Sequence, residues 1–177
     1  MPRSKSNNVL PQRYAIIPLI QHYIQHVHIL YPFLSETKIF ASLDALYNDG
    51  GRHAGPMDHF TVRMVLAITL SSLSVRRGDI KYQDAMGHTA AALELAELVL
   101  QPGSISGVQA TLLLVIFAIL DPHRFNSWYL MGIASRELVD LGMHQNPQGS
   151  EKKGPETDLR LQIFDCVYVL DRSVAPI

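Results

Sequence analysis

The chain has 177 residues, of which 47% are hydrophobic and 18% charged, and its 15 basic and 16 acidic side chains give a formal net charge of −1. That length and apolar content suit one domain with a buried core and exclude an intrinsically disordered chain. The near-zero charge argues against an autonomous nucleic-acid binder, which carries a basic surplus. The single cysteine, Cys166, excludes an internal disulfide framework and a thiolate-rich zinc site within this chain.

No targeting or membrane segment is evident in the sequence. The first eight residues are polar and do not lead into an apolar run with a small-residue cleavage site. The most apolar stretch, residues 108–120, contains Gln109 and ends at Asp121-Pro122. A bilayer needs roughly 20 apolar residues, so this stretch predicts a buried helix and no membrane association.

Helical periodicity and turn residues predict seven helices and no strand. In chain order they cover residues 14–28, 35–47, 58–77, 82–100, 105–120, 126–141 and a last segment from 158. An exposed loop, residues 145–157, precedes the last helix. We therefore expect an all-α fold, an irregular multi-helix bundle of about six to seven helices over residues 14–177, behind a disordered polar N-terminus of residues 1–13.

Polar residues mark the predicted helix ends. Ser35, Asp58 and Ser104 stand where N-cap side chains are expected. Gly142 is expected to stop the helix of residues 126–141, since glycine readily adopts the left-handed conformation that follows many helices.

Eight histidines raise the alternative of a metal protein. His22 and His26 lie four residues apart and would share one helical face, as paired zinc ligands do. A catalytic metal site also needs a third ligand and an activated water, and the sequence contains no H-E-x-x-H pattern, so we favour solvent-facing or hydrogen-bonded histidines. We expect no metal and no cofactor.

Enzyme chemistry has no positive support in the sequence. Glu94 and Glu97 are interpreted as solvated charges on the outside of a helix, and Cys166 as a buried, inert thiol. The sequence lacks a Gly-x-Ser-x-Gly elbow and a phosphate-cradling glycine loop. We expect a protein that is not an enzyme and has no catalytic residues.

Two adjacent charges, Asp171 and Arg172, stand in an otherwise apolar helix. Unpaired burial of either charge would be costly. We therefore predict a buried ion-pair network with an earlier helix, for which Arg136, Asp140 and Arg160 are the candidate partners. A ligand-anchoring role for the pair is the alternative.

Four sequence blocks in a fixed order carry a family resemblance. They are Tyr23–Leu34, Ser104–Leu114, Trp128–His144 and Arg160–Ser173. The third block is the most specific and contains Arg136, Asp140, Gly142 and His144, and the fourth contains Arg160, Asp171 and Arg172. In this order the blocks are similar to the fungal-specific transcription factor domain, the middle homology region of fungal zinc-cluster regulators.

The resemblance implies an all-α regulatory domain of a nuclear transcription regulator that controls target genes, for instance those of a metabolic gene cluster. The family's DNA-binding module is a six-cysteine zinc cluster, which this sequence does not contain. DNA contact is therefore expected only indirectly or through a module outside this chain. Because the family domain continues into further helices, residues 14–177 are expected to be C-terminally incomplete.

Protein partners or self-association are expected, and a hydrophobic small-molecule effector is a further partner that the resemblance implies. The last helix has a wide apolar stripe, which predicts an exposed apolar patch over residues 170–177. The rival functions are a helical small-ligand-binding module, with a pocket between the third, fifth and last predicted helices, and the His22–His26 metal protein.

Overall fold

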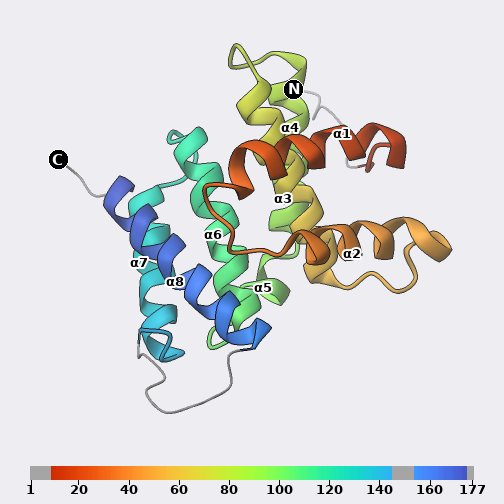
Figure 1. Cartoon of the computed structure of the whole chain (residues 1–177). Coiled ribbons are helices and arrows are strands. Elements are labelled where there is room, and N and C mark those ends of the chain that lie inside the picture. Colours follow the sequence, from red (N-terminus) through yellow and green to blue (C-terminus); the bar gives the residue numbers. More distant parts are fainter. Residues whose placement is uncertain (1–8, 145–153, 175–177) are drawn as a thin grey trace.

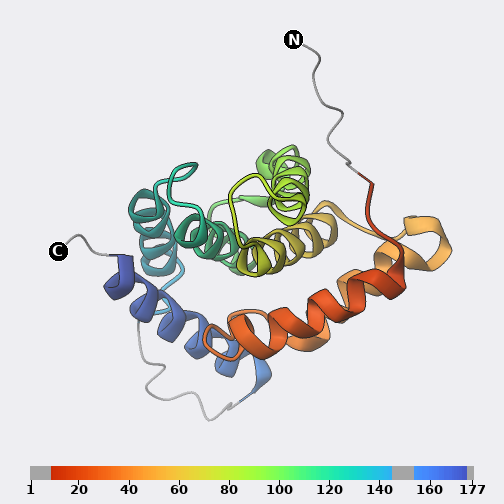
Figure 2. The same ribbon diagram turned by 90° about the horizontal axis from the view of Figure 1, so that it is seen from above.

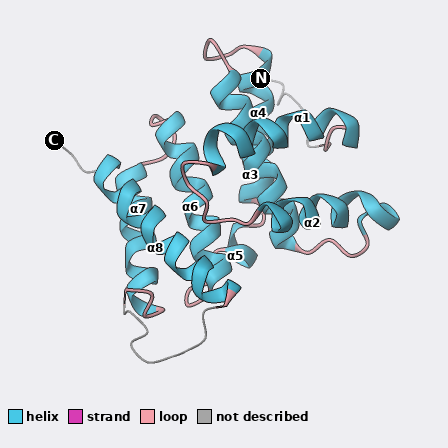
Figure 3. Ribbon diagram, viewed as in Figure 1, coloured by secondary structure: helices cyan, strands magenta, loops and turns pink. Residues whose placement is uncertain are grey.

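The computed structural model describes residues 9–144 and 154–174, and these residues form helices and loops without a strand (Figure 3). Their α-helices are α1 Arg13–Tyr23, α2 Glu36–Tyr47, α3 Pro56–Leu73, α4 Ile80–Leu93, α5 Ala96–Val99, α6 Ile105–Leu120, α7 Ser127–Asp140 and α8 Pro155–Val174. A π-helical turn, Ile24–His28, continues α1, and a 3-10 turn, Asn48–Gly51, follows α2. The predicted all-α multi-helix fold is confirmed for this part of the chain.

The helices are arranged in two layers around α6. One layer is a row of α7, α6 and α3, with α4 packed against α3 (Figure 1). α1 and α8 lie across one face of that row, with α8 against α7 and α6 and α1 against α3 (Figure 2). This arrangement leaves α7 at one edge of the molecule, with α6 and α8 as its neighbours.

The central position of α6 accounts for its composition. Every residue from Gly107 to Ala118 is buried. The polar Gln109 is satisfied inside the core, since its Nε2 donates to the Phe33 carbonyl oxygen at 2.7 Å and its Oε1 accepts from Lys38 Nζ at 2.7 Å. No helix in the described ranges is long and apolar enough to cross a membrane.

Most of the predicted helix starts agree with the structure. Ser35 caps α2 and Ser104 caps α6, each by accepting a backbone N–H with its side chain. Asp58 was predicted as an N-cap, and this prediction is wrong. Gly55 is the N-cap of α3, and Asp58 lies three residues further on, where its Oδ2 accepts the Gly55 N–H at 2.9 Å. Pro56 at the first helical position favours this earlier start.

Three predicted helices have different bounds in the structure. The helix expected to end at residue 77 ends at Leu73. The single helix expected over residues 82–100 begins earlier, at Ile80, and is divided at Glu94 and Leu95 into α4 and α5. The last helix begins at Pro155 and not at residue 158. Residues 145–153 of the predicted loop and residues 1–8 of the predicted N-terminus lie outside the described residues.

Candidate functional site

α7 buries one narrow face and leaves the opposite face open. Met131, Ala134 and Leu138 point into the core at spacings of three and four residues. Tyr129 and Ile133 occupy the other side of the helix and are 65% and 38% exposed. The open face of α7 is therefore partly apolar.

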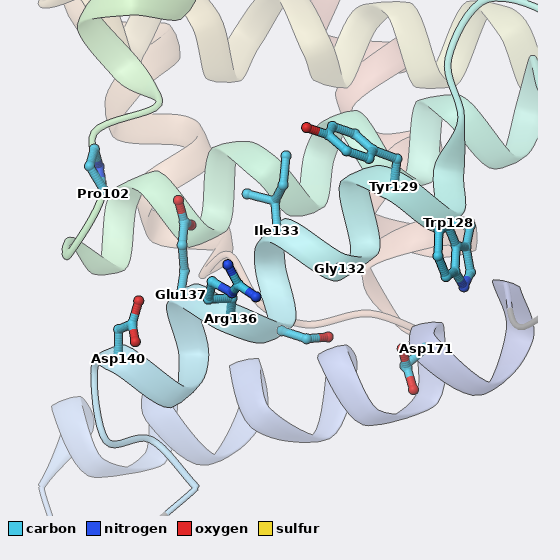
Figure 4. Close-up of a pocket in the computed structure, with 10 residues that line it drawn as sticks. Pro102, Trp128, Tyr129, Gly132, Ile133, Arg136, Glu137, Asp140 and Asp171 are labelled. Carbon is cyan, nitrogen blue, oxygen red and sulfur yellow. The ribbon is translucent and has the colours of Figure 1, made fainter.

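A groove of about 680 Å³ runs along this open face (Figure 4). Its lining residues come from α7, from α8 and from the turn before α6: Pro102, Trp128, Tyr129, Gly132, Ile133, Ser135, Arg136, Glu137, Asp140 and Asp171. Three of the residues that the sequence singled out, Arg136, Asp140 and Asp171, thus share one surface feature. Of the remaining lining residues, Tyr129, Ile133 and Glu137 belong to the third block of the resemblance but were not predicted as site residues, and Pro102 lies outside the four blocks.

The predicted buried ion-pair network is wrong. Arg136 and Asp140 on α7 are exposed, as are Asp171 and Arg172 on α8. Within the described part of the chain, none of these four side chains forms an ion pair. The Arg172 guanidinium lies over the Tyr168 ring instead, 4.8 Å from its centroid. The charges avoid burial because they lie on the outward faces of their helices, where water solvates them.

The C-terminal end of α7 is held by backbone contacts. Gly142 stops the helix as predicted, with φ of 64°. The Gly142 N–H donates to the Val139 carbonyl at 2.9 Å, and the Met143 N–H donates to the Leu138 carbonyl at 3.1 Å. These two hydrogen bonds form a Schellman motif.

Two further residues of the predicted set lie at this end of α7. Arg160 on α8 donates from Nη2 to the Leu141 carbonyl oxygen at 2.8 Å, and this hydrogen bond joins the two helices. His144 follows the motif and is exposed. Of the seven predicted site residues, Arg160 and Gly142 therefore act on the backbone at the junction between α7 and α8.

Acidic groups accumulate at the C-terminal half of the groove. Burial, and then the neighbouring Asp140 carboxylate, raises the pKa of Glu137. One oxygen of the Glu137 carboxylate, Oε2, is buried and has no hydrogen-bond partner among the residues described. Acidic side chains in the last turns of a helix also face the negative end of its dipole. This half of the groove would therefore favour a cationic group.

Comparison with known proteins identifies the family. The profile of the fungal specific transcription factor domain matches residues 20–177. The chain belongs to this family. The match includes α7, α8 and every residue that lines the groove, together with all four blocks that carried the resemblance in sequence.

Individual relatives of this fungal transcription factor domain are regulatory proteins. The chain is 34% identical over 80 residues to the pyrimidine pathway regulatory protein 1 of Saccharomyces cerevisiae, an alignment that covers 45% of this chain and 9% of the relative. It is 26% identical over 175 residues to the positive regulator of purine utilization of Emericella nidulans, an alignment that covers 84% of this chain and 16% of the relative. The chain thus spans less than a fifth of the length of these relatives. No solved structure gives a significant match.

The histidine pair proposed as metal ligands is placed as the spacing predicts. The rings of His22 and His26 stack with centroids 4.0 Å apart, and His26 Nδ1 lies 3.0 Å from the His22 carbonyl oxygen. In the described ranges, no group of three or more His, Cys, Asp or Glu side chains is arranged to hold a metal ion. The contacts that the structure shows for this pair are therefore to each other and to the backbone.

The predicted apolar patch and the predicted ligand pocket are both displaced. Leu170, the first residue of the predicted patch, is buried, and residues 175–177 lie outside the described residues. The exposed apolar side chains of this region are instead on α7 and on the outer side of α8, where Tyr168 and Val169 are about half exposed. The groove likewise lies on the outside of α7 and not between α3, α6 and α8.

Gly132 lies in the middle of the groove, and no other side chain packs against it. A Cβ atom added there would meet nothing within 4 Å, and its φ is not positive. Glycine inside a helix costs about 1 kcal/mol relative to alanine. Neither crowding nor backbone conformation within this chain requires glycine at this position, so it keeps the groove open at a cost in helix stability.

We expect Gly132→Ala to raise the free energy of unfolding by about 0.5 to 1 kcal/mol, because it removes this cost. The matched control is Gly142→Ala, which forces alanine to adopt φ of 64° and should lower the free energy of unfolding by about 1 kcal/mol. Urea denaturation at low protein concentration measures both changes. A loss of stability in Gly132→Ala would contradict the assignment of Gly132 to an open surface.

Proposed function

We propose that this chain is the regulatory domain of a fungal transcription regulator, and that it acts through contact between the α7 groove and another polypeptide. The observation that carries this proposal is the family match over residues 20–177. The names of the relatives, which are regulators of pyrimidine, purine and lactose genes or pathways, agree with it. The proposed role is regulatory and not catalytic, and the proposed place of action is the nucleus.

The surface chemistry supports contact with protein in preference to DNA. The chain carries a net charge of −1, and the groove has three acidic side chains against one arginine. A DNA-binding surface needs a basic patch to neutralise phosphates. Partly exposed aromatic side chains such as Trp128 and Tyr129 are typical of protein interfaces.

A reporter experiment in yeast tests the proposal. The chain is fused to an unrelated DNA-binding domain, and the output of one activation reporter and one repression reporter is compared with that of the DNA-binding domain alone. We expect a change of several fold, and we expect the double variant Tyr129→Ser, Ile133→Ser to abolish most of it. Lys81→Glu, on the exposed side of α4, is the control variant and should behave as the unchanged chain. Equal output from the fusion and the DNA-binding domain alone would contradict the proposed function.

A further inference from the structure

The α7 groove is long, and its two ends along the helix differ in chemistry. It runs from Trp128 to Asp140, which lie about 18 Å apart along the helix axis, since a helix rises about 1.5 Å per residue. Trp128, Tyr129 and Ile133 supply exposed apolar surface in the first half. Glu137 and Asp140 line the second half (Figure 4). The groove thus joins an apolar half to an acidic half on one helix face.

The groove also carries an excess of unpaired negative charge. Its acidic side chains are Glu137, Asp140 and Asp171, and Arg136 is the one basic side chain among the lining residues described. None of these four forms an ion pair within the described part of the chain. Three carboxylates and one guanidinium give the lining a formal charge of −2, although the whole chain carries only −1. Charge complementarity therefore favours a partner with a positive charge.

Glu137 is the acidic group that would gain most from such a partner. Burial, and then the Asp140 carboxylate, raises its pKa, so the surrounding protein disfavours the charged form of this side chain. A cation that approaches from the groove would stabilise the charged form instead. The acidic half of the groove therefore fits a lysine or arginine side chain better than a neutral one.

The walls of the groove favour a helical partner over an extended one. An extended peptide binds mainly by adding its backbone to the exposed edge of a sheet, and the described residues form no strand. A helix bonds its own backbone groups internally and offers side chains at positions i, i+3, i+4 and i+7 along one face. Three turns of helix span about 16 Å, which matches the length of the groove.

We propose that the α7 groove binds an amphipathic helix of a partner protein, with apolar side chains over Tyr129 and Ile133 and a lysine or arginine against Glu137 and Asp140. The inference rests on the proposed function for the groove's role in regulation, and it deepens that function by stating the chemistry of the polypeptide in the groove. Ile133 and Glu137 are one helical turn apart on α7. The basic side chain of the partner should therefore lie about one turn beyond its apolar residues.

Selection from a displayed peptide library tests this chemistry directly. The library presents helices of about 18 residues, long enough to be helical, in which the positions of one face are randomised. Sequences are selected on the unchanged chain, and those that also bind the double variant Tyr129→Ser, Ile133→Ser are removed. We expect the enriched sequences to carry two apolar residues three or four positions apart and a lysine or arginine about one turn beyond them. Enrichment of acidic or uncharged faces, or no enrichment, would overturn the proposal.

Trp128 shows where a selected peptide binds. It is the single tryptophan of the chain, is 60% exposed and lies in the apolar half of the groove. Titration with a selected peptide that lacks tryptophan should shift the Trp128 emission to shorter wavelength, because the peptide excludes water from the ring. A peptide of the same composition with its apolar residues spread around the helix should bind at least about tenfold more weakly. Calorimetric binding without a change in Trp128 emission would place the peptide elsewhere and overturn the proposal.

Charge variants test the acidic half of the groove. Glu137→Gln and Asp140→Asn should each weaken binding of the selected peptide about three- to fivefold, and the double variant at least about tenfold. Arg136→Gln, which removes the positive charge of the groove, should tighten binding about twofold. Asp84→Asn, on the exposed side of α4, is the matched control and should leave the affinity unchanged. A folded double variant that binds as tightly as the unchanged chain, or weaker binding by Arg136→Gln, would overturn the proposed charge contact.

The reporter experiment separates this inference from the proposed function. If Tyr129→Ser, Ile133→Ser abolishes the reporter output of the chain but the selection yields no basic amphipathic helix, the groove has an occupant of different chemistry and only this inference is wrong. If selected peptides bind with the expected variant effects but the chain never changes reporter output, the helix-binding groove stands and the proposed function is wrong.

Discussion

Gly107→Ala is expected to lower the free energy of unfolding by about 3 kcal/mol, because an added methyl group has no room at this position. A Cβ at position 107 would overlap the Gln101 carbonyl oxygen and would lie 2.9 Å from Ser104 Oγ. These atoms form the cap of α6: Ser104 Oγ accepts the Gly107 N–H at 2.9 Å and donates to the Gln101 carbonyl at 2.9 Å. Relief of the overlap therefore requires movement of backbone at the start of the central helix.

Urea denaturation measures this loss as a lower midpoint. The control is Gly132→Ala, the same substitution on an open surface, for which the opposite sign is expected. A decrease below about 0.5 kcal/mol for Gly107→Ala would mean that the cap of α6 rearranges at little cost, and that the tight turn before α6 is not required for the fold.

The second large effect is expected from acid. His88 lies on α4 against α3 and is 4% exposed. Burial, and then the nearby Arg63 guanidinium, lowers the pKa of His88 from 6.5 to about 4. The unfolded chain therefore binds a proton below pH 6.5 that the folded chain does not bind until about pH 4.

The sign of the effect follows from this difference in proton binding. The stability that neutral His88 permits is fully present above pH 6.5 and is lost as the pH falls towards 4. The loss reaches about 2 kcal/mol at pH 5 and about 3 kcal/mol near pH 4, since one pKa unit corresponds to about 1.4 kcal/mol.

Comparison with a variant isolates the contribution of His88 from that of other titrating groups. In His88→Leu the fall in stability between pH 7.5 and pH 5 should be about 2 kcal/mol smaller than in the unchanged chain. Gly132→Ala, which changes no titratable group, should leave the pH dependence unchanged. Chemical denaturation at a series of pH values gives both curves, and parallel curves for His88→Leu and the unchanged chain would contradict the role of His88.

The helices could be predicted well from the sequence because the residues that start and end them bind backbone groups close to them in the chain. Ser35 and Ser104 each start a helix, and Gly142 ends one, through hydrogen bonds between groups close in sequence, so their roles can be recognised without knowledge of the fold. Asp58 shows the limit of such signals. An acidic side chain can stand either at the N-cap or at the third helical position, and Pro56, which favours the first helical position, decides between them. The break between α4 and α5 follows no comparable signal in the sequence, because Glu94 and Leu95 are not helix breakers.

The candidate site was only partly predictable. The resemblance selected Arg136, Asp140 and Asp171, and the structure places all three at one groove. Their predicted burial was wrong, although the sequence contained the signal that could have corrected it. The stripe of Met131, Ala134 and Leu138 defines the buried face of α7, and helical periodicity then places Arg136 and Asp140 on the opposite face.

The contribution of α8 to the groove could not be derived in this way. Which side of α7 contacts α8 depends on how the two helices pack, and this packing includes the hydrogen bond from Arg160 to the Leu141 carbonyl. Side-chain type and spacing do not specify such a contact between a side chain and a distant backbone group.

The buried cysteine allows the rate at which α8 opens to be measured. Cys166 is 3% exposed, and burial, and then Asp165, raises the pKa of its thiol to about 12. Only the thiolate reacts with alkylating reagents, so the native chain is inert at neutral pH until α8 opens. Because the chain contains no other cysteine, each alkylated molecule records one opening of that helix. The rate of labelling therefore reports how often α8 opens, and a partner that holds α8 in place lowers this rate.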